Sequence, residues 1–434
     1  MTDDVFNKED GAPARFRWLP KPLRPPVQMP YRAERVILLV GAAAFFAGYD
    51  QNVFGLAAPQ IQATFHIPDN QLGPTVALFR TATVFALLIA ASADLVGRRR
   101  LLLVTLFGQA LFTLLTAFTQ NYEQFVAMQF LTRVFGYAEE MLCFVVVAEE
   151  MAAGARGWAN GTLSALYYMG AGVASLIFAL VTVLPSEWRA IYVIGAIPIF
   201  LVAWLRKRLP ETQRFAEREK VIRTMSKAAE ALSLLKDIAR QYPGRVISIV
   251  IAASAFGFAI SPATVLGATY LQTVYHYSPG QTTLLLVPGG LVGLVLAIAA
   301  GRLSDRIGRK PLAIAIAALA GICFYFFYSG APAWMMPPLW ILAFFGFFSG
   351  DALIAGFALE IVPTAYRATV SGLRYVFEIA CGAVALWLEG SLFDLYGAHG
   401  PAIQLCLASL PITLAILLFL PEPAGKSLEE MTRA

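Results

Sequence analysis

Charged residues are scarce in this sequence of 434 amino acids. Asp, Glu, Lys and Arg make up 14% of it, whereas a soluble domain has roughly a quarter. Hydrophobic residues make up 58% and occur in blocks of about 20, the length of helix that crosses the hydrocarbon core of a bilayer. The scarcity of charge excludes an ordinary water-soluble domain, and the blocks predict an all-α, polytopic membrane protein whose solvent is the lipid bilayer.

Cysteine and histidine are rarer still, with four and three copies. The cysteines have no paired spacing, and the histidines fall in predicted external loops without forming a cluster, so we expect no disulfide and no metal site. The sequence also has no phosphate-binding loop and no catalytic triad. We therefore expect no catalytic residue, no cofactor and no enzymatic activity, and any uphill work must draw on an ion or solute gradient instead of ATP.

Twelve apolar spans are predicted, separated by short loops. They cover residues 36–62, 71–92, 101–119, 124–152, 159–184, 188–206, 246–272, 281–300, 310–329, 337–361, 368–392 and 402–420. Lys and Arg gather in alternate loops and in both tails, while the loops between them hold none except Arg189. By the positive-inside rule, this pattern predicts that both termini are cytoplasmic, in the cell (inner) membrane. We therefore interpret the basic residues behind the net charge of +5 as a signal for orientation in the membrane, and we expect no nucleic-acid partner.

The chain divides into two helical halves with a linker between them. We predict an N-terminal cytoplasmic tail over 1–35, a six-helix half over 36–206, a linker over 207–245, a second half over 246–420 and a C-terminal cytoplasmic tail over 421–434. The linker mixes charged and apolar residues, which is typical of an amphipathic helix at the cytoplasmic surface. Both a solvated linker and a partner-binding segment fit this composition. We expect the protein to be a monomer.

An internal repeat relates the two halves. The turn Ala90-x-x-x-Asp94-x-x-Gly97-Arg98-Arg99 recurs as Gly301-x-x-x-Asp305-x-x-Gly308-Arg309-Lys310, an offset of 305 − 94 = 211 residues. The same offset relates Glu149 to Glu360, Arg156 to Arg367, Pro210 to Pro421 and Glu211 to Glu422. One register kept over this length indicates a duplicated six-helix unit, which is the construction of a two-lobed transporter.

These turns resemble the signature loop of the major facilitator superfamily. The segments AEEMAAGARG (148–157), LEIVPTAYRAT (359–369), LPETQRF (209–215) and LPEPAGKSLEEM (420–431) resemble its branch of sugar porters, aromatic-acid:proton symporters and organic-ion transporters. The resemblance implies 12 transmembrane helices in two six-helix repeats that move a small solute by alternating access. Ala90 stands where the family usually has glycine.

The resemblance also implies a charged latch at the cytoplasmic mouth, formed when that side is closed. Its members here would be Asp94, Arg98, Glu149, Arg156, Asp305, Arg309, Glu360 and Arg367. Charge-assisted hydrogen bonds between such groups hold helix ends together, and a carboxylate is also stabilised at a helix N-terminus. The alternative is charge that only sets the topology.

Two opposite charges lie at membrane depth in the first half, where ionisable side chains are costly and mark function. Asp50 lies in the sequence GYDQNVFGLAAPQI, and Arg133 lies in LTRVFG. The resemblance implies that Asp50 accepts the coupling proton and that Arg133 is its gating counter-charge. Because a nearby arginine favours an ionised carboxylate, a pair that opens and closes would take up and release a proton. The alternative is a static buried ion pair.

Further polar residues at membrane depth are candidates for substrate binding. They are Arg80, Glu139, Glu140, Tyr167, Asp351, Arg374 and Glu378. Either arginine suits an anionic substrate, the carboxylates suit a cation or protons, and the tyrosine suits stacking on a ring. Internal pairing is the alternative for each charged residue, and helix packing is the alternative for Tyr167. Arg374 and Glu378 stand one helical turn apart, where side chains meet.

Two departures bear on the substrate. Sugar porters carry a double glutamine in span 7 and a Gly-Pro-x-x-Trp element in span 10, but these spans read SAFGFAISPATVLGATYLQ and FFGFFSGDALIAGFALE. We therefore predict a secondary active transporter that carries a small organic acid or related polar metabolite together with protons. Proton-coupled sugar symport and proton-antiport efflux of organic cations or drugs stay open. An inactive relative acting as a receptor is disfavoured by the Asp50–Arg133 pair.

Overall fold

Every regular element in the described part of the chain is helical. The computed structural model describes residues 16, 24, 25, 27–93, 97–151, 155–206, 240, 242–360 and 367–422. The elements in chain order are α2 (Tyr31–Phe65), η2 (Asp69–Gln71), α3 (Leu72–Ala91), α5 (Arg98–Thr116), α6 (Tyr122–Glu150), α7 (Arg156–Phe178), α8 (Trp188–Arg206), α11 (Pro243–Val265), α12 (Gly267–Val274), α13 (Pro279–Ile307), α14 (Arg309–Phe327), η4 (Ala333–Met335), α15 (Met336–Glu360), α16 (Arg367–Tyr396), α17 (His399–Leu407) and α18 (Leu410–Phe419). The predicted amphipathic helix of the linker lies outside the described residues over 207–239.

Ten helical stretches among the described residues are long and apolar enough to cross a membrane. Each coincides with one of the predicted spans. The fourth and eighth predicted spans coincide with α6 and α13, which are 29 residues long. The middle of α6 carries Arg133, Glu139 and Glu140, which interrupt its apolar surface. The count of twelve spans therefore stays a prediction.

The chain forms two compact units. The first comprises Met1–Leu56 and Ala82–Arg223, and the second comprises Ala57–Thr81 and Thr224–Ala434. The end of α2 and the start of α3 thus group with the helices of the second unit. The predicted halves, 36–206 and 246–420, follow the sequence repeat instead and stay a prediction.

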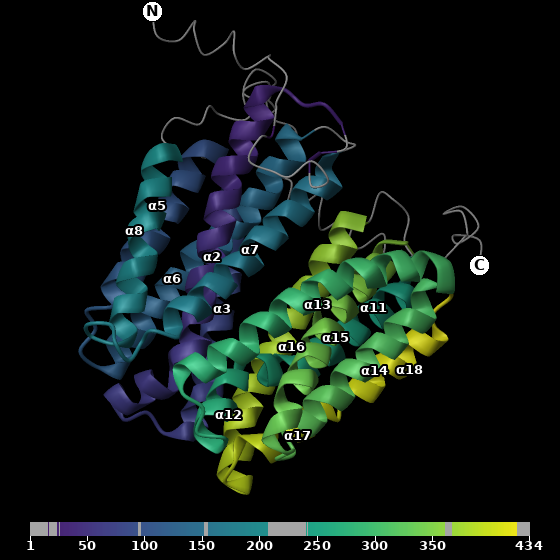
Figure 1. Ribbon diagram of the computed structural model, residues 1–434. Coiled ribbons are helices and arrows are strands. Elements are labelled where there is room, and N and C mark those ends of the chain that lie inside the picture. The colour runs from purple at the N-terminus through teal and green to yellow at the C-terminus, as the bar shows by residue number, and fades with distance from the viewer. Residues whose placement is uncertain are drawn as a thin grey trace, which may run out of the picture. The chain divides into compact units, whose positions relative to one another are not determined.

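In the first unit, α5 packs against α6 and α8, and α7 contacts α6 and α8 as well. Figure 1 shows these helices in blue and teal beside the purple α2. Their shared core includes the fully buried side chains of Ile37, Leu106, Leu142 and Ile199. Other large apolar side chains face outward, as Leu88 does at 68% exposure. An apolar outer surface is stable in lipid, so this arrangement fits a membrane protein.

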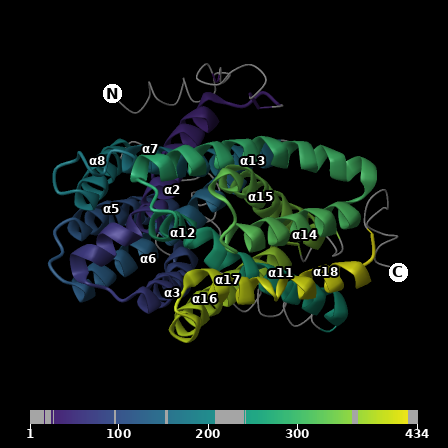
Figure 2. The ribbon, with the colours of Figure 1, turned by 60° about the horizontal axis from the view of Figure 1, so that its bottom comes forward.

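In the second unit, α11 packs against α16, and α15 packs against both α13 and α14. Figure 2 shows α16, α17 and α18 of this unit in yellow. Aromatic rings fill the contact between α14 and α15. Phe324 of α14 is fully buried there with its ring edge toward Trp340 of α15, and the rings of Trp340 and Phe344 lie with their centroids 4.3 Å apart, tilted by 38°.

Two predicted spans are interrupted in the structure. The seventh consists of α11 and α12, separated at Leu266, and the twelfth consists of α17 and α18, separated after Leu407. Pro411 lies in the first turn of α18, and a proline cannot donate the backbone hydrogen bond that would continue the preceding helix. Pro262, in the last turn of α11, removes a hydrogen bond in the same way.

The duplicated turns share an unusual backbone conformation. Gly97 has φ of 98° and Gly308 has φ of 108°, and each stands directly before the next helix. Side chains with a Cβ rarely adopt such angles, so glycine is required at both positions. The repeat seen in the sequence is therefore also a repeat in backbone geometry.

Candidate functional site

Close contact between α2 and α7 organises the first unit. A Cβ on Gly48 would occupy the position of the Tyr167 backbone carbonyl, and a Cβ on Gly170 would occupy that of the Phe45 carbonyl. Small residues let helix backbones approach in this way within membranes. The contact brings Tyr167 of α7 to the Asp50–Gln51 segment of α2.

Three predicted site residues meet around Gln51, which sequence analysis did not single out. The Tyr167 hydroxyl donates to Gln51 Oε1 over 3.0 Å, and Gln51 Nε2 donates to Glu140 Oε2 over 3.5 Å. The guanidinium of Arg133 donates to the Gln51 backbone carbonyl over 2.9 Å. We call these four residues the Gln51 cluster; its signal in the sequence was only that Gln51 follows Asp50.

Asp50 lies next to this cluster and is buried, with 1% of its surface exposed. Thr113 of α5 donates to Asp50 Oδ1 over 2.9 Å, and Oδ2 accepts no hydrogen bond from any residue that the structure describes. The charge of Arg133 acts on Asp50, yet no direct hydrogen bond or ion pair between the two is present among the described residues. The predicted pair is therefore an electrostatic one in this structure.

The adjacent glutamates of α6 have different surroundings. Glu139 accepts a hydrogen bond from Thr105 of α5 over 2.5 Å and contacts Cys143 Sγ at 3.3 Å. It is fully buried in the helix packing and does not join Glu140 in the Gln51 cluster. Successive residues of a helix point about 100° apart, so neighbours in sequence face different helices.

Four predicted substrate-binding residues come together in the second unit. The Arg374 Nη1 atom donates to Asp351 Oδ1 over 2.8 Å and to Glu378 Oε2 over 2.6 Å, so the predicted pairing of Arg374 with Glu378 is present. Nη1 of Arg80 on α3 lies against Gly382, one turn beyond Glu378, closely enough to clash with a Cβ there, and the charge of Arg80 acts on Glu378. We call Arg80, Asp351, Arg374 and Glu378 the Arg374 cluster.

The members of the Arg374 cluster differ in exposure. The side chain of Asp351 is 40% exposed, that of Glu378 15% and that of Arg374 7%. Arg374 Nε is buried without a partner among the described residues. The buried guanidinium thus presents donors beyond the two that Asp351 and Glu378 occupy, since arginine has five N–H groups.

One bond of the predicted latch lies within the described residues of the first unit. Arg98, which is 2% exposed, donates to Glu149 Oε1 over 3.0 Å. Asp94 lies outside the described residues, and Arg156 begins α7 with its side chain outside them. A second pair, Arg32 with Glu150 at 3.0 Å, lies beside it and was not predicted.

In the second unit a different carboxylate stands at the corresponding turn. The backbone N–H groups of Arg309 and Lys310 donate to the two carboxylate oxygens of Glu422, each over 2.9 Å. An anion is stabilised at a helix N-terminus by unpaired N–H groups, so Glu422 caps α14. The side chains of Asp305, Glu360 and Arg367 lie outside the described residues.

The histidines correct one expectation. His66 and His276 lie between helices as predicted, but His399 begins α17 and is 6% exposed. Its Nδ1 lies 2.7 Å from Glu389 Oε1, so it belongs to a buried polar pair instead of an external loop. Span 11 was predicted to end at residue 392 and span 12 to begin at residue 402, so no sequence pattern indicated that His399 is buried.

A bundle of apolar helices with charges gathered inside each unit defines a polytopic membrane transport protein. The Major Facilitator Superfamily profile matches residues 40–386, and the chain belongs to this superfamily of transporters, which are not enzymes. It is 27% identical over 408 residues to a putative metabolite transport protein of Haemophilus influenzae, covering 90% of this chain and 97% of that protein. It is also 27% identical over 407 residues to a citrate-proton symporter of Salmonella typhi, covering 86% and 87%. A crystal structure of a D-xylose-proton symporter has the same fold, with a TM-score of 0.72 at 18% identity over 90% of this chain and 99% of that one.

Proposed function

We propose that the protein is a proton-coupled symporter of a small organic acid or related polar metabolite, working by alternating access. The observation that carries the proposal is a buried guanidinium, Arg374, held by two carboxylates in one unit, alongside a buried carboxylate with an open oxygen, Asp50, in the other. One of the similar proteins is, by its name, a symporter of protons with citrate, which is a carboxylate.

Asp50 is the proposed proton acceptor. Its Oδ2 accepts no hydrogen bond from any described residue, so a proton can bind there while the hydrogen bond from Thr113 to Oδ1 stays in place. The positive charge of Arg133 favours the ionised form, and moving that charge away favours protonation. A change in the distance between Asp50 and Arg133 during the cycle would therefore load and unload the proton.

Arg374 is the proposed substrate anchor. A guanidinium binds a carboxylate through two parallel N–H bonds, which gives both affinity and orientation. A substrate carboxylate would replace Asp351, which is the more exposed of the two carboxylates that now contact Arg374. It would also accept hydrogen bonds from guanidinium N–H groups other than those of Nη1. Arg80 adds a second positive charge beside Glu378.

Proton-driven efflux of an organic cation is the second candidate. Arg374 is already neutralised by two carboxylates, and Asp351 exposes 40% of its side chain. A cationic substrate would bind Asp351 directly and leave the arginine in place. Sugar symport has no comparable observation in its favour.

The remaining predicted features form part of the same proposal. The halves 36–206 and 246–420 would be the two lobes, with both termini cytoplasmic in the inner membrane and a monomer as the working form. The bond between Arg98 and Glu149 would belong to the latch that forms when the cytoplasmic side is closed.

Uptake into liposomes tests the proposal. Purified protein is reconstituted and given an inward proton gradient with labelled citrate, an aromatic acid, xylose or a quaternary ammonium ion. We expect the gradient to accelerate uptake of an acid several-fold, and Asp50→Asn to abolish this acceleration while exchange of acid for acid continues. Acid uptake that ignores the gradient, or a response to xylose or the ammonium ion alone, would contradict the proposal.

Glu123→Gln supplies the matched control. Glu123 is an exposed carboxylate in the first turn of α6, so its removal deletes a charge without touching either cluster. The gradient response of this variant should equal that of the unaltered protein.

A further inference from the structure

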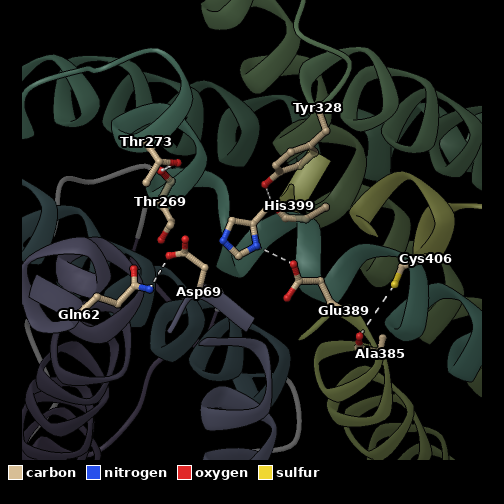
Figure 3. A network of polar contacts seen from close by, with 10 residues as sticks. Gln62, Asp69, Thr269, Thr273, Tyr328, Ala385, Glu389, His399 and Cys406 are labelled. Atoms are coloured by element: carbon tan, nitrogen blue, oxygen red, sulfur yellow. Dashed lines mark hydrogen bonds and ion pairs between the residues drawn. The ribbon is translucent and has the colours of Figure 1, made fainter. Parts of the chain in front are cut away.

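A buried histidine–carboxylate pair lies in the second unit, apart from the Arg374 cluster. Figure 3 shows the His399 ring turned toward the Glu389 carboxylate, with 2.7 Å between Nδ1 and Oε1. Glu389 is 0% exposed, and it stands 11 residues beyond Glu378 on α16, about 16 Å along the helix. The other two atoms of the pair, Glu389 Oε2 and His399 Nε2, are buried without a partner among the described residues.

The repeat does not account for this pair. The positions 211 residues earlier hold Phe178 and Trp188, both fully buried apolar side chains. The duplicated scaffold is therefore stable with hydrocarbon at these places. A buried ionisable pair in the second half alone needs another explanation, since such groups are costly at membrane depth.

The first turn of α3 seals the pair. A Cβ on Gly73 would lie 2.7 Å from Glu389 Oε2, so the α3 backbone covers the carboxylate directly. The backbone carbonyl of Asn70 and the ring of Pro74 fill the space beside Gly390, and Asn70 Nδ2 donates to Asp394 Oδ1 over 2.8 Å. We call this the α3–α16 seal.

Sealing the pair fixes its proton. A lone carboxylate buried without a counter-charge is strongly unfavourable, so a sealed Glu389 must share a proton with His399. Breaking the seal admits water, which solvates the carboxylate and lets the proton leave. We propose that Glu389 and His399 form a second proton-binding site, which holds its proton while the α3–α16 seal is intact and exchanges it with the external solution when the seal opens.

Among the ionisable groups that the structure describes around Glu389, only His399 can carry a positive charge. The ionisable groups of the described elements around the pair are Asp69 of η2, Tyr270 of α12, Tyr328 after α14, Asp394 of α16 and Cys406 of α17. All of them are neutral or negative. Figure 3 shows Asp69 bonded to Gln62 in the same network, so that carboxylate already has a donor.

The direction of the pH dependence follows from counting protons. By the proposal, sealing takes up one proton and opening releases it to the external solution. A falling external pH therefore favours the seal, and a rising pH favours opening.

Disulfide trapping tests the site without substrate or gradient. Cysteines replace Asn70 and Asp394 across the seal, in the full-length protein in liposomes, and the rate of oxidative cross-linking is measured at pH 6.5 and pH 8. The same cysteine pair is also measured in a Glu389→Gln background. The intrinsic pH dependence of thiol oxidation is the same in both proteins, so it drops out of the comparison. Because low pH favours the closed seal, we expect the rate at pH 6.5 divided by the rate at pH 8 to be at least threefold lower in the Glu389→Gln background. One linked proton allows this ratio to change at most about tenfold per pH unit.

Two further variants make the outcome decisive. His399→Gln should lower the ratio as Glu389→Gln does, and it replaces that variant if Glu389→Gln does not fold. Glu123→Gln should leave the ratio unchanged, because this exposed carboxylate in the first turn of α6 belongs to neither proposed proton site. An unchanged ratio in both Glu389→Gln and His399→Gln, or a ratio lost in Glu123→Gln, would overturn the proposal. The proposal rests on the proposed transport cycle, but cross-linking needs no uptake, so the two can fail independently.

Discussion

Neighbouring residues on one helix can have unrelated tasks, and Glu139 and Glu140 show this at the scale of single side chains. Glu139 is bonded to Thr105 inside the helix packing, whereas Glu140 reaches Gln51 and through it Tyr167. The two are the same type of residue at adjacent positions of α6, so their contacts differ because of the direction in which each side chain points.

Substitution of each glutamate by glutamine should separate these tasks. Glu139→Gln weakens a charge-assisted hydrogen bond in the core, and we expect a loss of about 1–3 kcal/mol in stability, visible as a lower melting temperature in detergent. Glu140→Gln should mainly change the KM for transport and its pH profile. A melting temperature lowered more by Glu140→Gln than by Glu139→Gln would contradict this assignment.

Arg374 offers a second test at this scale. Arg374→Lys keeps the positive charge but removes the planar fork that donates to Asp351 and Glu378 together. We expect the KM for an acid to rise about tenfold or more, equivalent to about 1.4 kcal/mol of binding free energy. Arg189→Lys, in the first turn of α8 and outside the Arg374 cluster, is the matched control. Equal KM values in both variants would remove Arg374 from the binding site.

At the scale of helices, the crossing of α2 and α7 determines where the Gln51 cluster forms. Gly48 and Gly170 allow backbone contact, and Tyr167 reaches Gln51 because the helices are this close. The position of the Tyr167 side chain thus depends on the absence of side chains at Gly48 and Gly170.

Alanine at Gly170 should therefore damage the unit, while alanine at Gly172 should not. A methyl group on Gly170 meets the Phe45 carbonyl, whereas one on Gly172 meets nothing within 4 Å. We expect Gly170→Ala to cost about 1–3 kcal/mol, the usual range for overpacking, and Gly172→Ala to be neutral or slightly stabilising. Thermal unfolding of the two variants measures the difference, and equal melting temperatures would refute it.

The helices themselves could be predicted from the sequence far better than their contacts. Apolar blocks and the repeat located the spans, and the turns at Gly97 and Gly308 have the shared geometry that the repeat indicates. The Gln51 cluster and the pair of Glu389 with His399 could not be found this way. Their members come from different helices, and no local pattern fixes how one helix is rotated against another.

At the scale of the whole molecule, the orientation in the membrane is still a prediction. Fusion of a reporter active only in the cytoplasm to the C-terminus should give signal, because Lys and Arg predict that this end is inside. A phosphatase active only outside should be active when fused after Ser329, in the loop between α14 and α15. Activity of both reporters at the same position would contradict the predicted topology.

The sequence repeat singles out one position in the second unit. Ser261 is the repeat counterpart of Asp50, and its buried hydroxyl has no partner among the described residues. It borders Gly382 at the same place as Arg80 Nη1. An aspartate introduced there would stand beside an arginine already in place, as Asp50 stands near Arg133. If transport is proton-coupled as proposed, we expect Ser261→Asp to change the number of protons carried per cycle, and with it the concentration ratio of substrate that the carrier can sustain.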